Sequence, residues 1–217
     1  MDIVAEETVS YSAYAVVDLL DAFASNEPVP GGGSAAALAG SLGVSLLVMV
    51  AGLPKTRTMA PEEATDLAEA SSRLRPLRES LIQLVDRDSD AYREVMAALK
   101  RPKATDAEKA ARRQAIQDSM REATAVPLEV MRACQQALAG AVVVARNAYK
   151  LAASDVGMGV ELVAAALRGS GMSVVGNLSS IADAAYVERA GTERKQLEAD
   201  GLADAERALA SLSAGRS

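Results

Sequence analysis

The stretch from Ala35 to Leu53 contains no charged residue, and it constrains the fold of this chain more than any other segment. Ala, Leu and Val dominate the stretch, and Ala and Leu are strong helix formers. A helix that is apolar on all sides is either buried among other helices or spans a membrane. Because the stretch also holds Gly40, Gly43 and Gly52 and has no flanking aromatic belt, we expect the central helix of a bundle and no membrane partner.

The rest of the chain also has helical patterns. Pro61 suits the first turn of a helix, and Thr105 with Glu108 has the pattern of a capping box. The expected helices cover residues 10–24, 34–54, 61–99, 105–139, 141–167 and 172–212, with bends at Pro76 and Pro127. The predicted fold class is therefore all-α, a bundle of about six long, partly kinked helices. We expect a single domain over residues 1–217, with the last few residues frayed.

The composition predicts that this bundle needs a second copy of itself. Half of the residues are hydrophobic, yet the chain has one Phe and no Trp. Long helices in a chain of this size leave apolar faces that an isologous dimer would bury. We therefore expect a homodimer.

Charge and residue usage exclude several classes of function. The net charge of −6, with both signs interspersed, argues against a nucleic-acid partner. Cys134 is the only cysteine, so no intrachain disulfide can form. The absence of histidine excludes a Ser-His-Asp triad and histidine metal ligands. The acidic start of the chain has no cationic region of a signal peptide, so we expect a cytoplasmic protein.

A carboxylate interrupts the apolar stripe of the third expected helix. Leu74, Leu81 and Val95 recur at seven-residue intervals, and the missing position of that series is Asp88. A carboxylate on a core seam is costly unless it is paired or used. Tyr92 lies one turn further on the same face. Asp88 is thus a candidate functional residue, and the alternative is a solvated or ion-paired carboxylate.

Polar residues also interrupt the last two expected helices. Asn147 and Asp155 share a face with Leu151 and other bulky residues of the fifth helix, so both need partners if they are buried. A ligand would satisfy them, and so would a hydrogen bond between helices. Asn177 and Asp183 lie among apolar residues of the sixth helix, where capping or exposure is the simpler explanation.

The loop of Gly31, Gly32, Gly33 and Ser34 precedes the uncharged helix. Successive backbone N–H groups at a helix start can hold an anion, and glycines let a ligand approach the backbone closely. No Gly-Lys-Ser/Thr sequence follows, so this is not a Walker loop. A tight turn before a buried helix explains the loop equally well.

At these positions the chain resembles the cyclodeaminase domain of formiminotransferase-cyclodeaminases, a family that includes free-standing methenyltetrahydrofolate cyclohydrolases. The resemblance covers roughly residues 8–190. It is carried by residues 28–40, 88–92, 102–109 and 126–128, by the run from Asn147 to Asp155 followed by Val156-Gly157, and by Asn177 and Asp183. The chain departs from the usual pattern at Arg146, where a Gly is usual, and over residues 172–177, where an extra Asn is usual.

The resemblance implies an all-α homodimer that acts on a folate. Cyclohydrolases and cyclodeaminases share these motifs, and the absence of a formiminotransferase domain favours hydrolysis of 5,10-methenyltetrahydrofolate to 10-formyltetrahydrofolate. Release of ammonia from formiminotetrahydrofolate is the first alternative. A non-catalytic folate-binding or structural dimer is the second. No metal or redox cofactor is expected, because the sequence has no acidic cluster with a plausible set of metal ligands. The tetrahydrofolate derivative is the expected substrate.

For that reaction, Asp88 is the candidate base and anionic partner of the substrate cation, with Tyr92 assisting. Asp155 is expected to accept hydrogen bonds from the pterin, with Asn147 assisting. Lys103 is expected to contact the glutamate tail, and the loop from Gly31 to Ser34 is an alternative anion site. Asn177 and Asp183 complete the expected substrate-binding set.

Overall fold

The computed structural model describes residues 10–53 and 59–214. These residues form six α-helices and two short 3-10 helices, and no strand occurs among them. In chain order the elements are η1 (Tyr11–Ala13), α1 (Val16–Ala24), α2 (Gly32–Ala51), α3 (Pro61–Lys100), α4 (Asp106–Asn147), η2 (Lys150–Ala152), α5 (Ala153–Leu178) and α6 (Ala184–Ala214). The predicted all-α class is confirmed.

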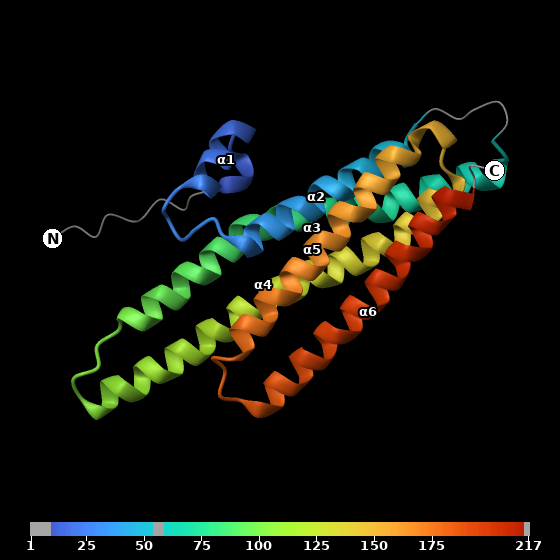
Figure 1. The fold of residues 1–217 in the computed structure, drawn as a ribbon. Coiled ribbons are helices and arrows are strands. Elements are labelled where there is room, and N and C mark those ends of the chain that lie inside the picture. Colours follow the sequence, from blue (N-terminus) through green and yellow to red (C-terminus); the bar gives the residue numbers. More distant parts are fainter. Residues whose placement is uncertain (1–9, 54–58, 215–217) are drawn as a thin grey trace.

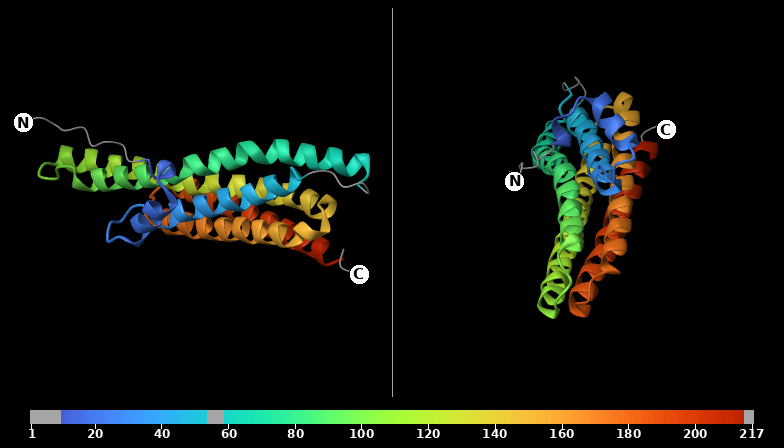
Figure 2. Two further views of the ribbon diagram at one scale, coloured as in Figure 1. Left: turned by 90° about the horizontal axis from the view of Figure 1, so that it is seen from above. Right: turned by 90° about the vertical axis from the view of Figure 1, so that its left-hand side faces the viewer.

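Helices α2, α3, α4 and α5 pack together as the centre of an elongated bundle (Figure 1). Helix α2 packs against α3 and α5, and α4 packs against the same two helices from the other side. Helix α6 lies along α4 and α5. Seen from above, the hairpin of α3 and α4 extends beyond the start of α2 (Figure 2). The start of α2 therefore meets α3 well before α3 ends.

Helix α2 is the uncharged segment, and most of it is core as predicted. Ala37, Val44 and Leu47 are fully buried. Two glycines bring α2 and α5 together, because a Cβ at Gly43 would lie 2.7 Å from the carbonyl oxygen of Gly159. By length and composition alone, three helices of residues 10–53 and 59–214 could cross a membrane, and α2 is one of them. In the bundle, 56% of the most apolar stretch of α2 is buried.

One side of α2 is not covered by any other helix of residues 10–53 and 59–214. Leu42 and Met49, two turns apart, are 54% and 44% exposed. The expectation of a helix surrounded on all sides is therefore met only in part by one copy of the chain.

The helix starts follow the predicted signals. Pro61 is the first residue of α3. At α4 the backbone N–H of Glu108 donates to Thr105 Oγ1 at 3.2 Å, and the backbone N–H of Thr105 donates to Glu108 Oε2 at 2.9 Å. The predicted capping box is confirmed.

Two predicted boundaries in the second half are wrong. Helix α4 continues through Gly140 to Asn147, and α5 continues through the glycines at 169 and 171 to Leu178. These glycines serve packing, since a Cβ at Gly140 would lie 3.1 Å from Leu74 and one at Gly169 3.5 Å from Ala36. Asn147 is therefore the last residue of α4, whereas Asp155 lies in the first turn of α5.

The first predicted helix is also corrected. It is split into η1 and α1, and its apolar residues Tyr14, Val17 and Leu20 are exposed. Leu19 is the buried residue of α1. The predicted fraying at the end of the chain concerns residues 215–217, which lie outside the described residues.

Candidate active site

A cavity of about 410 Å³ opens where the start of α2, the last third of α3, the middle of α4 and the end of α5 meet. Volumes of this order suit a small-molecule ligand. The lining residues are Pro28, Val29, Gly31, Gly32, Gly33, Asp88, Tyr92, Val95, Met120, Ala123, Ser173, Gly176 and Asn177. The structure thus brings together the glycine loop, Asp88 with Tyr92, and Asn177, which the sequence placed in a loop and on two different helices.

Asp88 lies directly against the N-terminal turn of α2. The Ser34 hydroxyl lies 2.9 Å from Asp88 Oδ2, and a Cβ at Gly33 would overlap the Asp88 carboxylate. Glycine at position 33 leaves the space that the Asp88 carboxylate occupies against α2. The partial positive charge of the helix start stabilises a carboxylate in this position. The α2 N-terminus therefore faces an anion of the protein itself.

Burial raises the pKa of Asp88 above its usual range, although the hydroxyl and backbone N–H of Ser34 oppose the shift. The carboxylate is thus partly desolvated and yet held by two donors. A base of raised pKa accepts a proton more readily than an exposed aspartate does.

Ser34 and Ser89 form a buried layer beneath this carboxylate. Both residues are 0% exposed, and their hydroxyl oxygens lie 3.1 Å apart. The Ser34 oxygen also lies 2.9 Å from the carbonyl oxygen of Val85. A hydroxyl that donates to Asp88 can accept from Ser89, so the pair can orient the carboxylate. Ser34, expected to contact substrate, is instead buried behind Asp88.

Ser89 was not predicted from the sequence to belong to the site. The signal was available, because Ser89 continues the four-residue spacing of the buried Leu81 and Val85. A serine on a buried helix face needs a hydrogen-bond partner.

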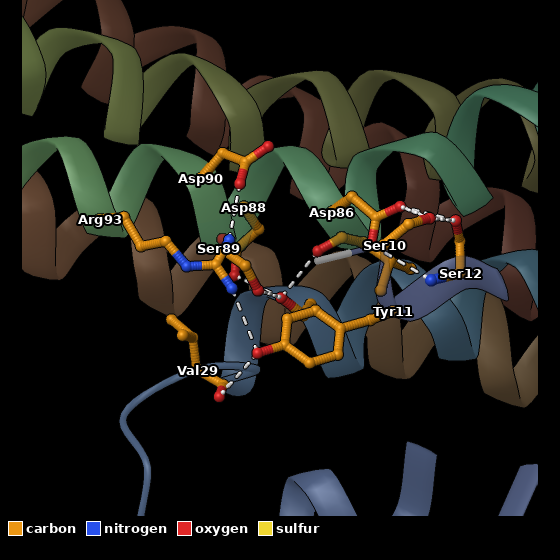
Figure 3. Close-up of polar contacts among 11 residues, drawn as sticks. Ser10, Tyr11, Ser12, Val29, Asp86, Asp88, Ser89, Asp90 and Arg93 are labelled. Atoms are coloured by element: carbon orange, nitrogen blue, oxygen red, sulfur yellow. Dashed lines mark hydrogen bonds and ion pairs between the residues drawn. The ribbon is translucent and has the colours of Figure 1, made fainter. Parts of the chain in front are cut away.

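A second polar network holds the loop that forms one wall of the cavity (Figure 3). The Tyr11 hydroxyl donates to the carbonyl oxygen of Val29 at 3.1 Å and accepts from Arg93 Nη2 at 3.2 Å. Arg93 in turn pairs with Asp90 at 2.7 Å. No sequence signal linked Tyr11 to Arg93, because 82 positions separate them.

Tyr92 and Asn177 present polar groups at the cavity. Tyr92 is 38% exposed. The Asn177 side-chain amide donates to the carbonyl oxygen of Ala123 at 2.6 Å, which fixes the side chain between α5 and α4. Its carboxamide oxygen remains an acceptor for a ligand.

The other predicted substrate-binding residues lie elsewhere in the single chain. Lys103 is exposed in the turn between α3 and α4. Asn147 donates to Asp66 Oδ2 at 3.1 Å near the opposite end of the bundle. Asp155 is in the first turn of α5, and Asn177 is near its last residue. At 1.5 Å per residue, about 33 Å of helix separates these two residues.

Asp183 caps α6. Its Oδ1 accepts from the backbone N–H of Tyr186 at 3.1 Å, and its Oδ2 pairs with Arg121 at 3.2 Å. The bond from Tyr186 lowers the pKa of this carboxyl, and Arg121 adds to the effect. Asp183 thus caps a helix, and capping was the simpler explanation of this residue in the sequence.

Comparison with known proteins identifies the family. Residues 15–196 match the family model described as formiminotransferase-cyclodeaminase. The chain belongs to the formiminotransferase-cyclodeaminase family. A methenyltetrahydrofolate cyclohydrolase from Methylorubrum extorquens is 36% identical over 188 residues, which are 87% of this chain and 90% of that protein. A formimidoyltransferase-cyclodeaminase from Gallus gallus is 30% identical over 77% of this chain and 30% of its own length.

The fold of this formiminotransferase-cyclodeaminase family member has a counterpart among solved structures. The crystal structure of a formiminotetrahydrofolate cyclodeaminase from Thermotoga maritima superposes with a TM-score of 0.83 and 23% identity. The match covers 93% of this chain and 97% of that one. At this identity the likeness supports the fold alone.

Proposed function

We propose that this protein is a cytoplasmic enzyme of folate one-carbon metabolism that hydrolyses 5,10-methenyltetrahydrofolate to 10-formyltetrahydrofolate. The observation that carries the proposal is a partly desolvated carboxylate, Asp88, which lines a cavity and is held by Ser34. The similarity to a cyclohydrolase over most of both chains supports the same reaction.

Asp88 suits the charge of the substrate. The bridging carbon of methenyltetrahydrofolate belongs to an amidinium cation, and an anion in a site that excludes water stabilises it strongly. The cavity lining contains no lysine or arginine that would repel the cation.

Asp88 also suits the proton transfers. Water attacks the bridging carbon, forms a C–O bond and gives its proton to Asp88. The bond from that carbon to one ring nitrogen then breaks while the hydroxyl loses its proton and becomes the formyl carbonyl. The released nitrogen takes up one of the two protons that the water has given up, and the other leaves to solvent. The product carries the formyl group on the other nitrogen. Tyr92 borders the same space and can position the water.

The remaining parts of the substrate have candidate partners. The Asn177 oxygen and the backbone of the glycine loop can hydrogen-bond the pterin. Lys100 lies twelve residues after Asp88 on α3, about 18 Å along the helix axis, and Lys103 follows in the turn. We propose that a polyglutamate tail runs toward this turn.

We further propose that the chain forms one domain and works as a homodimer without metal or redox cofactor, nucleic acid or membrane. The exposed apolar residues of α2 and α5 support the dimer, because monomeric proteins rarely leave large apolar patches exposed.

The decisive experiment is a spectrophotometric assay of purified protein with methenyltetrahydrofolate, and with formiminotetrahydrofolate in parallel. Loss of the methenyl absorbance supports the cyclohydrolase. Turnover only of the formimino compound, with release of ammonia, assigns the protein to the cyclodeaminases of its family. Folate binding without turnover of either compound leaves a non-catalytic folate-binding dimer.

A further inference from the structure

Two prolines lie inside long helices, Pro76 in α3 and Pro127 in α4, and Pro127 is buried. A proline has no backbone N–H, so it cannot donate to the carbonyl oxygen four residues earlier, and its ring pushes that carbonyl aside. In α4 this carbonyl belongs to Ala123. The Ala123 oxygen therefore lacks the donor that a regular helix would give it.

The Ala123 carbonyl lies at the wall of the Asp88 cavity, and its donor comes from another helix. Ala123 and Asn177 both line this cavity. The Asn177 side-chain amide donates to the Ala123 oxygen at 2.6 Å, from 54 positions further along the chain. A partly buried carbonyl needs a donor. The donor here is a side chain of the site in place of the backbone N–H that residue 127 lacks.

This bond also determines which end of the Asn177 carboxamide is available to a ligand. A carboxamide has an NH2 end that donates and an oxygen that accepts. Because a carbonyl oxygen can only accept, the Nδ2 end of Asn177 must face Ala123. The Asn177 oxygen is then left for the cavity, where it can accept from an N–H group of a ligand.

The end of α5 that carries Asn177 is also held on α4 by a second side chain. Gln117 Nε2 donates to the carbonyl oxygen of Ser180 at 3.0 Å. Gln117 Oε1 accepts from the backbone N–H of Ala182 at 2.7 Å. The backbone around Asn177 is therefore fixed by Gln117, and the bond to Ala123 has only the Asn177 side chain left to orient.

We propose that Pro127 is a positioning residue for ligand binding. Pro127 keeps the Ala123 carbonyl free of a helical donor, and that carbonyl holds the Asn177 amide so that the Asn177 oxygen accepts from an N–H group of the ligand. The lining of the cavity includes Ala123 and Asn177 but not Pro127, so Pro127 acts through these two residues. The ligand is the folate of the proposed function, on which the binding readout rests.

NMR of Pro127→Ala tests the orientation without any ligand. The variant restores the N–H of residue 127, which we expect to donate to the Ala123 carbonyl as in a regular helix and to be protected from hydrogen exchange. The side-chain NH2 resonance of Asn177, assigned by its absence from Asn177→Ala, should shift because its acceptor is taken. An unprotected amide at position 127, or an unchanged Asn177 resonance, overturns the proposal.

Folate binding tests the consequence. We expect Pro127→Ala to bind 5-formyltetrahydrofolate about three- to tenfold more weakly in titration calorimetry, the scale of one hydrogen bond. Pro127→Val restores the same N–H on a larger side chain, so an effect of the N–H appears in both variants, whereas an effect of packing differs between them. Binding as tight as wild type in both variants overturns the proposal.

Pro76→Ala is the matched control. It makes the same chemical change in α3, where the carbonyl four residues earlier belongs to Ser72. Ser72 and Pro76 line a different cavity of about 770 Å³, which does not include Asn177. We expect Pro76→Ala to bind folate as wild type does. An equal loss in Pro76→Ala would show a general effect of straightening a long helix and would overturn the specific role of Pro127.

A double-mutant cycle tests whether Pro127 acts through Asn177. If it does, Pro127→Ala adds no further loss to Asn177→Ala, and the double variant binds 5-formyltetrahydrofolate as Asn177→Ala does. Additive losses would show another route to the ligand and overturn the proposal. A wild type that binds no folate would instead contradict the proposed function, and the NMR comparison would then decide the positioning of Asn177 by itself.

Discussion

At the scale of single residues, the site depends on how closely α2 approaches Asp88. Gly33 has no Cβ, and the Asp88 carboxylate occupies the space where a Cβ would lie. Ser34, the next residue, then reaches the same carboxylate with its hydroxyl. Two adjacent small residues of α2 thus determine the position of Asp88, and Ser34 opposes the rise in its pKa that burial causes.

Replacing Asp88 by Asn should separate catalysis from stability. Asn keeps the shape but removes the charge, so we expect turnover to fall about 100-fold or more. Thermal stability should stay the same or rise, because a partly buried charge is removed. Asp200→Asn, on the exposed surface of α6, is the matched control. An unfolded Asp88→Asn protein whose folded fraction retains full specific activity would make Asp88 a structural residue.

The pH dependence should follow the raised pKa of Asp88. Because the folded-state value lies above the unfolded one, the folded protein binds the extra proton, and this group's contribution to stability is lost as pH rises through the folded pKa. The stability gain of Asp88→Asn over wild type should therefore grow with pH across that window. Denaturant titrations at several pH values measure it. The acid limb of turnover should also lie above the usual aspartate range, and a limb at the ordinary value would contradict the assignment.

Gly32 should be needed for ligand binding and not for folding. A Cβ there would meet nothing within 4 Å, so Gly32→Val fits the free chain but enters the cavity. We expect folate binding to be lost while helical circular dichroism is retained. Gly191→Val on α6, where a Cβ would meet Leu178 at 3.9 Å, is the control and should bind normally. Normal binding by Gly32→Val would show that the loop is a turn that does not contact the ligand.

At the scale of elements, the hairpin of α3 and α4 reaches beyond the start of α2 and carries a basic turn (Figure 2). The turn contains Arg101 and Lys103, both exposed. Exposed lysines attract nearby carboxylates but contribute modestly one at a time. The element is therefore expected to affect the affinity for long anionic substrates more than the chemical step.

Lys103→Ala should weaken binding of polyglutamylated folate more than binding of monoglutamylated folate. A loss of about two- to fivefold, larger at low salt, is the scale of one exposed ion pair. Titrations with both folates at two salt concentrations measure the difference. Lys195→Ala, an exposed lysine of α6, is the control. Equal losses for the two folates would show that Lys103 does not contact the tail.

At the scale of the whole molecule, α1, α2 and α5 carry exposed apolar residues, and α2 and α5 pack side by side. Leu42 and Met49 of α2 accompany Met158 and Met172 of α5 on the surface. A single copy leaves this apolar surface in water, and an isologous partner would cover it.

Purified wild-type protein should therefore be a dimer at micromolar concentration. Burial of the α2 and α5 side chains supplies the free energy of association. Multi-angle light scattering measures the mass directly, and Ala165→Arg, which places a charge among the exposed apolar residues of α5, should shift it toward the monomer. A stable wild-type monomer would contradict the proposed dimer.

The sequence by itself determined what depends on local spacing and propensity. The uncharged segment, the start of α3 and the capping box of α4 follow from residues within a few positions of one another. Asp88 was recognised because its neighbours on the same helix face are apolar. The sequence predicted helix breaks near residues 140 and 168–171, but α4 and α5 are continuous there. The glycines at 140, 169 and 171 serve close packing and do not end helices.

Only the tertiary structure decided which distant residues meet. Ser34 and Asp88 are 54 positions apart, and Tyr11 and Arg93 are 82 apart, so helix periodicity carries no information about either pair. The same holds for Asp155, which periodicity grouped with Asn147 on one helix, whereas α4 ends at Asn147 and α5 begins only after the 3-10 helix η2. Contacts between helices depend on how whole faces pack, and side-chain volume across the bundle, rather than spacing along the chain, determines that packing.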